Sequence, residues 1–230
     1  MTTEPITALV TGANRGLGRR FAEQLLERGA TVYAAARDPQ TVDLPGAIPL
    51  QLDITDPESV RRAAETAGDV TVLINNAGVS TRAGLLDGPI DDIRLEMETH
   101  YFGTLAVTRA FVPVIERNIA GRGGGAILNV LSVLSWAHLP TSGAYAAAKA
   151  AGWALTDAVR TELAPRGIHV AALHVGYMDT DMVSYIPAEQ KTDPGVVAAL
   201  ALDGLFAGQP EILGDDLTRT VKAHLSDSPQ

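Results

Sequence analysis

The chain has 230 residues, 46% of them hydrophobic, which suits a single domain with a large core. Its formal net charge of -9 argues against nonspecific binding to nucleic acid or to an anionic membrane surface. It contains no cysteine, which excludes disulfides, thiol nucleophiles and cysteine-ligated zinc.

Short apolar runs alternate with helical patterns along the whole chain. In chain order, the predicted elements are a strand at 6–11, a helix at 16–28, strands at 31–35 and 47–52, a helix at 56–67, a strand at 70–75, a helix at 90–115, a strand at 126–131, a helix at 143–163, a strand at 168–174, and helices at 193–206 and 215–224. The helix at 90–115 is expected to bend near Gly103. Asp56-Pro57 and Asp193-Pro194 have the residue types of a helix N-cap followed by the first helical position.

Strands that alternate with helices in this way indicate a parallel, doubly wound α/β sheet with helices on both faces. The chain shows no internal repeat and no domain boundary, and the glycine-rich connector at 121–125 is too short to join two domains. We therefore expect one Rossmann-like domain over residues 1–230.

No segment has the features of a targeting or membrane-spanning sequence. Residues 1–5 carry Glu4 and no basic run, and the apolar stretch after them is too short for a signal peptide. The uncharged run at 123–148 is broken by Pro140 and Gly143, so we interpret it as a strand, a loop and a helix start. A cytoplasmic protein is the simplest expectation.

A glycine-rich loop follows the first predicted strand, with the sequence Thr11-Gly12-Ala13-Asn14-Arg15-Gly16-Leu17-Gly18. Glycines let the backbone approach a phosphate closely, and the start of a helix offers free N–H groups and the positive end of its dipole. The spacing differs from the Gly-x-Gly-x-x-Gly of the common dinucleotide fingerprint. The alternative is a tight turn without a ligand, but the position between a first strand and an amphipathic helix favours a phosphate site.

Tyr145 and Lys149 are four residues apart in a predicted helix, with Ser132 upstream. Residues i and i+4 share one face of a helix, so the phenol and the ammonium can converge. A cation beside a phenol lowers its pKa, which is otherwise near ~10. The pair therefore suggests proton transfer to or from an oxygen near neutral pH.

These features together resemble the short-chain dehydrogenase/reductase family, in its compact single-domain branch, over nearly the whole chain. Four motifs carry the resemblance in order: the cofactor loop Thr11-Gly12-x-x-x-Gly16-x-Gly18, the segment Asn75-Asn76-Ala77-Gly78, the catalytic set Ser132, Tyr145 and Lys149, and the pair Gly176 and Thr180. The resemblance implies that residues 1–230 form one NAD(P)-binding Rossmann-fold oxidoreductase domain.

The resemblance also bears on the choice of cofactor. Ala36 ends the second strand, where an acidic residue would bind the ribose hydroxyls of NAD. Arg37 follows it and Arg15 lies in the glycine loop, so two guanidiniums could clamp the 2′-phosphate of NADP(H). Alternatively, both arginines are ordinary surface charges, and Asp38 could partly neutralise Arg37. NAD(H) is the less favoured cofactor.

The family pattern implies a set of residues that contact the cofactor. Asp53 resembles the residue that contacts the adenine, although it could simply begin the turn into the next helix. No metal site is expected. The complete cofactor set is Gly12, Asn14, Arg15, Gly16, Leu17, Gly18, Arg37, Asp53, Ile54, Asn76, Ala77, Gly78, Tyr145, Lys149, Gly176 and Thr180.

The resemblance implies a defined chemistry. Tyr145 donates a proton to a substrate carbonyl oxygen while NADPH delivers hydride to the carbon. Ser132 holds that oxygen by a hydrogen bond, and Lys149 binds the nicotinamide ribose and acidifies Tyr145. Thr180 contacts the nicotinamide carboxamide.

Two positions depart from the family pattern. His100 stands where the family has a catalytic asparagine, whose backbone carbonyl holds a water for the proton relay. His100 would keep that carbonyl, and its imidazole, with a reference pKa of about 6.5, could shuttle protons, so we count it as a catalytic candidate. Val175 replaces the family's proline before Gly176 and is expected to have a smaller effect.

The residues support three functional hypotheses. The leading one is an NADPH-dependent reductase that converts an apolar ketone or aldehyde to an alcohol. His100 and Val175 motivate the second, a catalytically impaired regulatory or interaction protein that binds NADP. The third is an NAD-dependent alcohol dehydrogenase, against which Arg15 and Arg37 argue.

The expected partners are a small carbonyl or alcohol substrate and a second copy of the chain, with neither nucleic acid nor membrane. The helices at 90–115 and 143–163 are apolar on more than one face, as in a family homodimer or homotetramer, or as required by burial on the sheet alone. The apolar loop at 177–189 resembles the family's substrate loop. The predicted pocket wall comprises Leu134, Trp136, Tyr177, Met182 and Tyr185.

Overall fold

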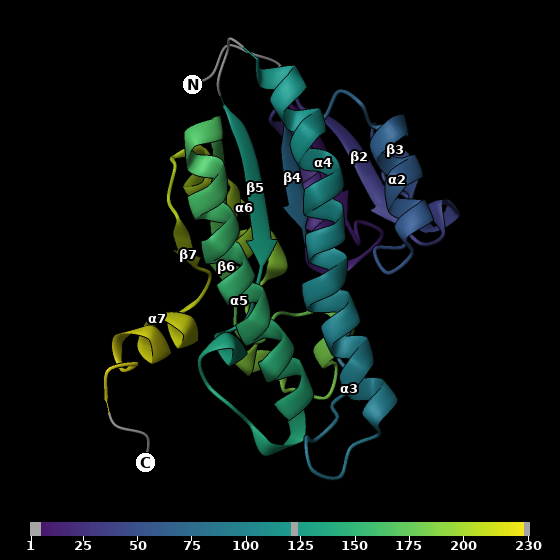
Figure 1. The fold of residues 1–230 in the computed structure, drawn as a ribbon. Helices are drawn as coiled ribbons and strands as arrows, with labels where there is room; N and C mark the ends of the chain where they lie inside the picture. Colours follow the sequence, from purple (N-terminus) through teal and green to yellow (C-terminus); the bar gives the residue numbers. More distant parts are fainter. Residues whose placement is uncertain (1–5, 121–123, 228–230) are drawn as a thin grey trace.

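A single seven-stranded sheet organises the computed structural model, which describes residues 6–120 and 124–227. All strands are parallel, in the order β3-β2-β1-β4-β5-β6-β7 (Figure 1). The strands are β1 (Thr7–Thr11), β2 (Thr31–Ala36), β3 (Ile48–Gln51), β4 (Val72–Asn75), β5 (Gly125–Val130), β6 (Ile168–His174) and β7 (Glu211–Leu213). The predicted doubly wound α/β fold is confirmed.

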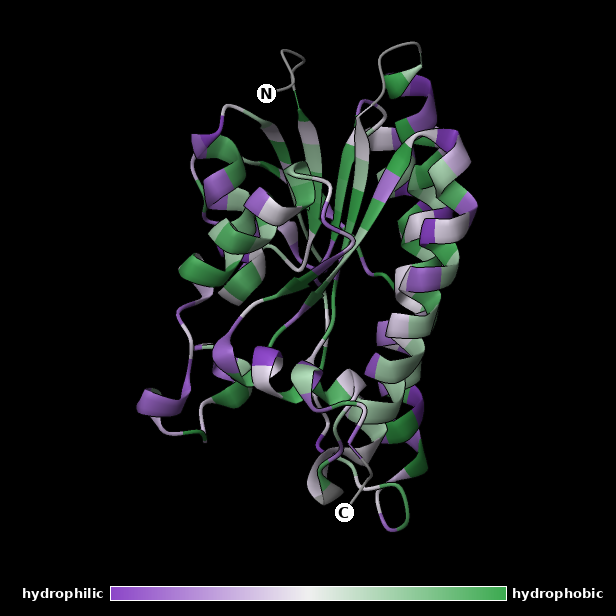
Figure 2. Cartoon of the chain, turned by 90° about the vertical axis from the view of Figure 1, so that its left-hand side faces the viewer, coloured by the Kyte–Doolittle hydropathy of each residue, from purple (hydrophilic) through white to green (hydrophobic). Residues whose placement is uncertain are grey.

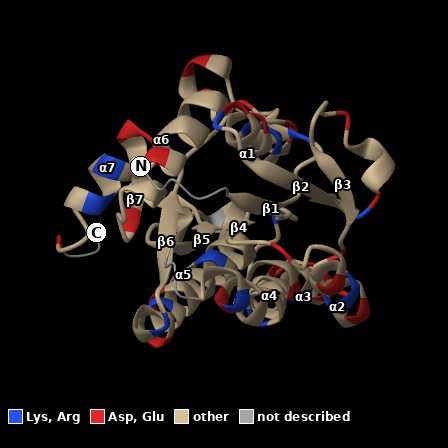
Figure 3. Cartoon of the chain, turned by 90° about the horizontal axis from the view of Figure 1, so that it is seen from above, with Lys and Arg blue, Asp and Glu red and all other residues tan. Residues whose placement is uncertain are grey.

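Helices cover both faces of this sheet (Figure 3). The helices are α1 (Gly16–Glu27), α2 (Pro57–Thr66), α3 (Ile90–Met97), α4 (Thr104–Ile119), α5 (Gly143–Leu163), α6 (Pro194–Phe206) and α7 (Asp216–Ala223). α1 and α6 pack together on one face, and α2, α4 and α5 lie on the other. Apolar side chains fill a core on each side of the sheet, where hydrophobic colouring concentrates in Figure 2.

The carboxyl ends of the parallel strands share one edge of the sheet, the lower edge in Figure 1. β1 and β4 are neighbours at the centre, although two strands separate them in the sequence. In an open α/β sheet, ligands bind outside the carboxyl ends of the strands at such a reversal of strand order. The loops that leave this edge therefore define where a site is expected.

Capping side chains begin two helices where the sequence predicts them. The Asp56 carboxylate accepts a hydrogen bond from the N–H of Glu58 at 3.0 Å, and Asp193 accepts one from the N–H of Gly195 at 2.7 Å. In each case a proline follows at the first helical position, where its missing N–H is not needed.

The predicted helix at 90–115 consists of three pieces. α3 ends at Met97, a π-helical turn spans Glu98–Gly103, and α4 continues to Ile119. A Cβ added at Gly103 would lie 2.9 Å from Ile54 Cδ1, so glycine permits this close approach. The irregularity expected near Gly103 is therefore a π-helical turn, a feature frequent at functional sites.

The sequence did not predict β7. Its three residues pair with the end of β6, and Ile212 alone is buried. Residues 1–5 and 121–123, which carry the expectation about the signal peptide and most of the predicted connector, lie outside the described residues. Within the described residues, every helix is too short or too polar to cross a lipid bilayer.

Candidate active site

The glycine loop between β1 and α1 forms a cradle that side chains would fill. Gly12 and Gly16 have φ of 65° and 55°, in the left-handed region that favours glycine. A Cβ at Gly18 would lie 2.2 Å from the Gly12 carbonyl oxygen. Arg15 at the N-cap makes no side-chain cap, and the first turn of α1 contains no acid. The residues present therefore fit an anion such as a pyrophosphate.

Asn76 and Thr11 brace this loop from the side of β4. The Asn76 amide donates to the carbonyls of Thr11 at 2.8 Å and Gly12 at 3.3 Å. The Thr11 hydroxyl accepts from the N–H groups of Asn76 and Ala77, both at 2.9 Å. Asn76 was predicted to contact the cofactor, but its side chain is bonded to the loop that would hold the cofactor.

A buried polar ladder behind the site was missed in the sequence. Asn75 on β4 donates to Asn129 on β5 at 2.8 Å and to Thr108 on α4 at 3.1 Å. Asn129 in turn donates to Thr156 on α5 at 2.9 Å. The sequence did contain a signal for this ladder, because Asn75 and Asn129 are polar residues in otherwise apolar strands. Buried amides need such partners, and here they tie two strands to two helices.

The residues predicted to bind a 2′-phosphate lie at the end of β2 and in the glycine loop. Arg37 is exposed and, among the described residues, makes no ion pair. The Asp38 carboxylate instead accepts from the N–H of Gln40 at 3.0 Å, so it stabilises its own turn. Arg15 makes an exposed ion pair with Asp181 at 3.2 Å.

Asp53 forms the turn that the sequence left open as an alternative. Its Oδ1 accepts from the N–H and the hydroxyl of Thr55, at 2.9 and 2.7 Å. Ile54 is buried against Gly103, and Leu17 is buried in the core beneath the glycine loop. In this structure, then, the Asp53 side chain stabilises its own turn, and Ile54 and Leu17 pack in the interior.

Ser132, Tyr145 and Lys149 come together at the carboxyl edge of the sheet. Ser132 follows β5 by two positions and is buried, and its Oγ accepts from the N–H of Leu134 at 3.1 Å. Tyr145 lies in the first turn of α5, near enough to Ser132 for the serine hydroxyl to act on the pKa of the phenol. Lys149, one turn later, is buried and donates to the Val130 carbonyl at 2.8 Å.

The prediction that Lys149 lowers the pKa of Tyr145 is wrong for this structure. Burial raises the pKa of Tyr145, the charge of Glu96 raises it further, and the Ser132 hydrogen bond opposes them in part. The Lys149 Nζ lies 5.5 Å from the centre of the Tyr145 ring and is bonded to a backbone carbonyl. Burial lowers the pKa of Lys149 itself to about 8.

His100 lies in the π-helical turn and contacts Tyr145. The two rings meet edge to face, with centroids 5.1 Å apart. The His100 Nε2 is 2.9 Å from the Val79 carbonyl, and burial lowers the pKa of the imidazole. A Cβ at Gly78 would lie 2.7 Å from the His100 Cε1, so this glycine makes room for the ring.

Glu96 is a fully buried carboxylate that the sequence analysis missed. Its Oε1 accepts from the N–H and the hydroxyl of Thr81, at 2.6 and 2.9 Å. Its Oε2 lies 3.2 Å from the His100 Nε2. Burial acts to raise the pKa of Glu96, but the bonds from His100 and Thr81 outweigh it and hold the pKa below its usual range. An acid four residues before His100 on one helical face was the available signal.

Two predicted pocket residues lie in the loop after β6. Met182 and Tyr185 are about half exposed, and Tyr185 is near enough to Tyr145 to raise its pKa. The Arg82 guanidinium lies 4.3 Å above the Tyr185 ring and joins the loop after β4 to the loop after β6. Arg82 has a φ of 59°, unusual for a residue other than glycine.

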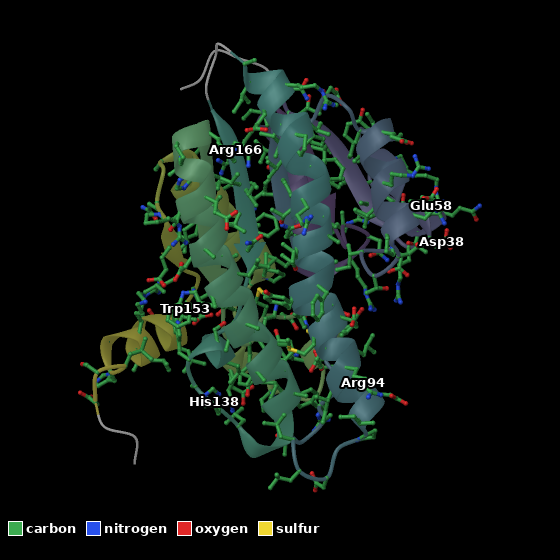
Figure 4. All side chains as sticks on the ribbon, viewed as in Figure 1. Asp38, Glu58, Arg94, His138, Trp153 and Arg166 are labelled. Carbon is green, nitrogen blue, oxygen red and sulfur yellow. The ribbon has the colours of Figure 1, made fainter. Side chains whose placement is uncertain are left out.

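Trp136 was predicted to line the pocket, and the structure packs its partly buried ring against an aromatic cluster. It stacks on His174 with centroids 3.8 Å apart, and Lys222 of α7 lies 4.6 Å from its centre. Trp153, labelled beside α7 in Figure 4, completes this cluster. The His174 Nδ1–H donates to the Ser132 carbonyl at 3.2 Å, so the cluster supports the loop that carries Ser132.

The loop after β6 joins the cofactor side of the site to the end of the chain. Gly176 donates its N–H to the Asp215 carboxylate at 2.5 Å, and Asp215 also caps α7. Thr180 lies against the glycine loop, because a Cβ at Gly16 would be 3.4 Å from its Cγ2. Tyr177 and Leu134 are partly buried along the same edge.

Known proteins share this sequence pattern. The sequence profile of the short chain dehydrogenase family matches residues 6–191. A Drosophila melanogaster relative named Dehydrogenase/reductase SDR family protein 7-like is 30% identical over 94% of this chain and 74% of its own length. A Schizosaccharomyces pombe relative named NADPH-dependent 1-acyldihydroxyacetone phosphate reductase is 33% identical over 76% of this chain and 61% of its own length.

Solved structures share the architecture. A short chain dehydrogenase from Burkholderia cenocepacia in complex with NADP matches with a TM-score of 0.92 and 38% identity, over 99% of this chain and 95% of that one. A short-chain dehydrogenase from Streptomyces avermitilis matches with a TM-score of 0.85 and 27% identity, over 98% and 93%. The similarity thus extends over nearly the full length of both structures.

Proposed function

Because the chain belongs to the short chain dehydrogenase family of oxidoreductases, we propose that it is an NADPH-dependent reductase that converts an apolar ketone or aldehyde to an alcohol. The observation that supports the proposal is that Ser132, Tyr145 and Lys149 lie together at the carboxyl edge of the sheet, the edge from which the glycine loop after β1 also leaves. The whole of residues 1–230 would then serve as one oxidoreductase domain.

NADP(H) is the proposed cofactor. The cradle at Gly12 and Gly18 would hold the pyrophosphate, and Arg37 with Arg15 would meet the 2′-phosphate. Ala36 leaves no acid at the end of β2 to bind the ribose hydroxyls or to repel that phosphate. The structural relative from Burkholderia cenocepacia carries NADP, and the yeast relative is named for NADPH, which supports the same choice.

The residues of the chain divide the remaining work. Bound NADPH would supply hydride to the carbonyl carbon. Tyr145 would give its proton to the carbonyl oxygen as the C=O π bond breaks, so that the substrate gains one hydride and one proton. Ser132 would hold that oxygen, and Lys149 would bind the nicotinamide ribose. The raised pKa of Tyr145 suits a proton donor, because it keeps the phenol protonated.

An apolar substrate is proposed from residues in the loop after β6. Met182 and Tyr185 present apolar surface there, and Leu134 and Tyr177 lie along the same edge. The yeast relative is named for a ketone that carries both an acyl group and a phosphate, and its acyl group is compatible with such a pocket. A panel that includes aliphatic, aromatic and long-chain carbonyl compounds is therefore the appropriate test set.

The test is NADPH consumption across that panel by the wild type and by Tyr145→Phe. The wild type is expected to turn over at least one carbonyl. The variant is expected to lose ~10²-fold or more in kcat, since general acid catalysis contributes 10²–10⁴-fold, while binding NADPH with unchanged affinity. Full activity of Tyr145→Phe would contradict the mechanism.

A second candidate function rests on His100. Its imidazole is held by Glu96 and the Val79 carbonyl at a position where the family pattern has asparagine. A protein that binds NADP without turning substrate over would follow if this change impairs the proton relay. Turnover by His100→Asn, with none by the wild type on the same panel, would favour this candidate over the reductase.

We also propose that the protein forms a homodimer, or a homotetramer built from such dimers, through the outer faces of α4 and α5. A groove between these helices is lined largely by apolar side chains, among them Met97, Tyr101, Leu105, Val112, Leu155 and Val159. A second groove, between α4 and α2, includes the half-exposed Phe102. Apolar surface of this kind is typical of two-fold interfaces.

A further inference from the structure

Glu96 places a carboxylate in the protein interior, where an ionised group is energetically unfavourable. It lies on α3 with its side chain fully buried where α3 packs against α5. Removing a carboxylate from water is unfavourable unless partners compensate. Thr81 compensates Oε1 with two hydrogen bonds. Among the described residues, Oε2 has no hydrogen-bond partner, and His100 Nε2 lies 3.2 Å from it.

The Val79 carbonyl and the Glu96 carboxylate together fix the state of the imidazole. Two acceptors face the His100 Nε2, the Val79 carbonyl at 2.9 Å and Glu96 Oε2 at 3.2 Å. Nε2 must therefore carry hydrogen, which leaves Nδ1 as an acceptor in the neutral ring. Burial and the nearby Lys149 keep His100 neutral by lowering its pKa. A neutral ring adds no positive charge beside Tyr145, so the charge of Glu96 is left uncancelled.

We propose that Glu96 is a positioning residue for the reduction: its buried carboxylate orients His100 against Tyr145 and keeps Tyr145 in the phenol form that donates the proton. This inference rests on the proposed function and deepens it. A negative charge in surroundings of low dielectric disfavours a second negative charge nearby, here the phenolate.

The charged and titratable groups around Tyr145 come from every element packed against it. Glu96 on α3 and Tyr185 from the loop after β6 raise the pKa of the phenol, and the Ser132 hydrogen bond lowers it. Lys149 on α5 is held at the Val130 carbonyl, and His100 is neutral. Glu96 is therefore the negative charge in this set, and its removal is expected to ease ionisation of Tyr145.

The experiment compares Glu96→Gln with the wild type over a range of pH. Reduction needs the phenol and alcohol oxidation needs the phenolate. In Glu96→Gln, we expect the alkaline limb of kcat/KM for reduction and the acid limb for oxidation to move to lower pH, by about one unit. Glu98→Gln, an exposed glutamate two positions later, is the matched control and is expected to leave both limbs in place.

A second readout does not depend on turnover. Ultraviolet titration of tyrosine ionisation, with Tyr145→Phe subtracted to isolate Tyr145, should show the phenol ionising at lower pH in Glu96→Gln than in the wild type. If Glu96→Gln does not fold by circular dichroism, Glu96→Leu, which removes the charge but fills the space, must give the same shift.

Each result has a defined meaning. A lower rate at every pH with unmoved limbs and an unmoved titration would overturn the inference, since Glu96 would then be merely structural. An equal shift in Glu98→Gln would also overturn it. A wild type without turnover would contradict the proposed reductase, while the tyrosine titration would still decide the effect of Glu96.

Discussion

At the scale of single residues, groups from several parts of the chain govern the proton of Tyr145. Burial and the Glu96 carboxylate raise its pKa, and the Ser132 hydroxyl opposes them. Lys149, whose own pKa burial lowers to about 8, is anchored on the Val130 carbonyl instead of the phenol. The site therefore keeps a protonated phenol near a buried amine, an arrangement that suits a donor to a carbonyl oxygen.

Arg37 gives a prediction at the same scale. Its guanidinium is exposed at the end of β2 and, among the described residues, has no carboxylate partner. Arg37→Ala is expected to weaken NADPH binding about tenfold, because a charge-assisted hydrogen bond to the 2′-phosphate is lost, and to leave NADH binding nearly unchanged. Titration calorimetry with both cofactors measures this. Arg117→Ala, an exposed arginine near the end of α4, is the control, and equal weakening for both cofactors would contradict the assignment.

At the scale of elements, local signals predicted most of the fold. Aspartate-proline pairs at the starts of α2 and α6 predicted both helices, because a cap and the residue after it act within one turn. The predicted bounds of α5 and β6 match the structure. β7 was missed because three residues with one buried side chain carry too little periodicity.

The surroundings of some residues could not be predicted from the sequence, because contacts between distant segments determine them. Trp136 follows Ser132 closely, but β6 supplies the ring that stacks on it and α7 supplies the lysine beside it. Glu96 resembles a surface acid on an amphipathic helix until Thr81 and His100 are seen to surround it. Motif spacing pointed to Ser132, Tyr145 and Lys149, which the structure brings together. It could not report their electrostatic surroundings, which the tertiary structure sets.

The outer face of α4 gives a prediction at the scale of elements. Leu105 lines the groove toward α5 and the groove toward α2. Leu105→Glu is expected to weaken self-association roughly tenfold or more, since it would bury a charge in an apolar interface. Light scattering over a dilution series measures the mass. Leu86→Glu, at a fully exposed loop position outside both grooves, is the control. A wild type that is monomeric at all concentrations would contradict the proposed interface.

At the scale of the whole molecule, the site is assembled from both halves of the chain. The first half supplies the glycine cradle and the Asn76 brace, and the second supplies Ser132, Tyr145 and Lys149. The Asn75–Asn129 hydrogen bond joins the halves at the centre of the sheet. Residues late in the chain support the site, because the Asp215 carboxylate binds the N–H of Gly176 and His174 binds the Ser132 carbonyl. Stability of the fold and geometry of the site are thus coupled through these buried polar contacts.

His174 makes this coupling measurable as a dependence of stability on pH. It is fully buried, and burial lowers its pKa to about 4, from an ordinary value of about 6.5 in the unfolded chain. Between these values the unfolded state binds the additional proton, so the free energy of unfolding falls as the pH falls. Between pH 7 and pH 4, His174 alone is expected to lower the free energy of unfolding by up to about 3 kcal/mol.

The measurement is urea unfolding at pH 7, 5.5 and 4 for the wild type and His174→Phe. Phenylalanine keeps a ring to stack on Trp136 but cannot titrate. The variant should therefore lose less stability on acidification than the wild type, by the amount that His174 contributes. It also leaves the Ser132 carbonyl without a donor, so we expect the variant to be about 1 kcal/mol less stable at pH 7. The pKa of Glu96 is also lowered, so its carboxylate stops stabilising the fold once acid protonates it. The variant should therefore retain part of the fall in the free energy of unfolding with falling pH. Equal slopes in the two proteins would mean that His174 does not titrate on unfolding, and that another group produces the sensitivity to acid.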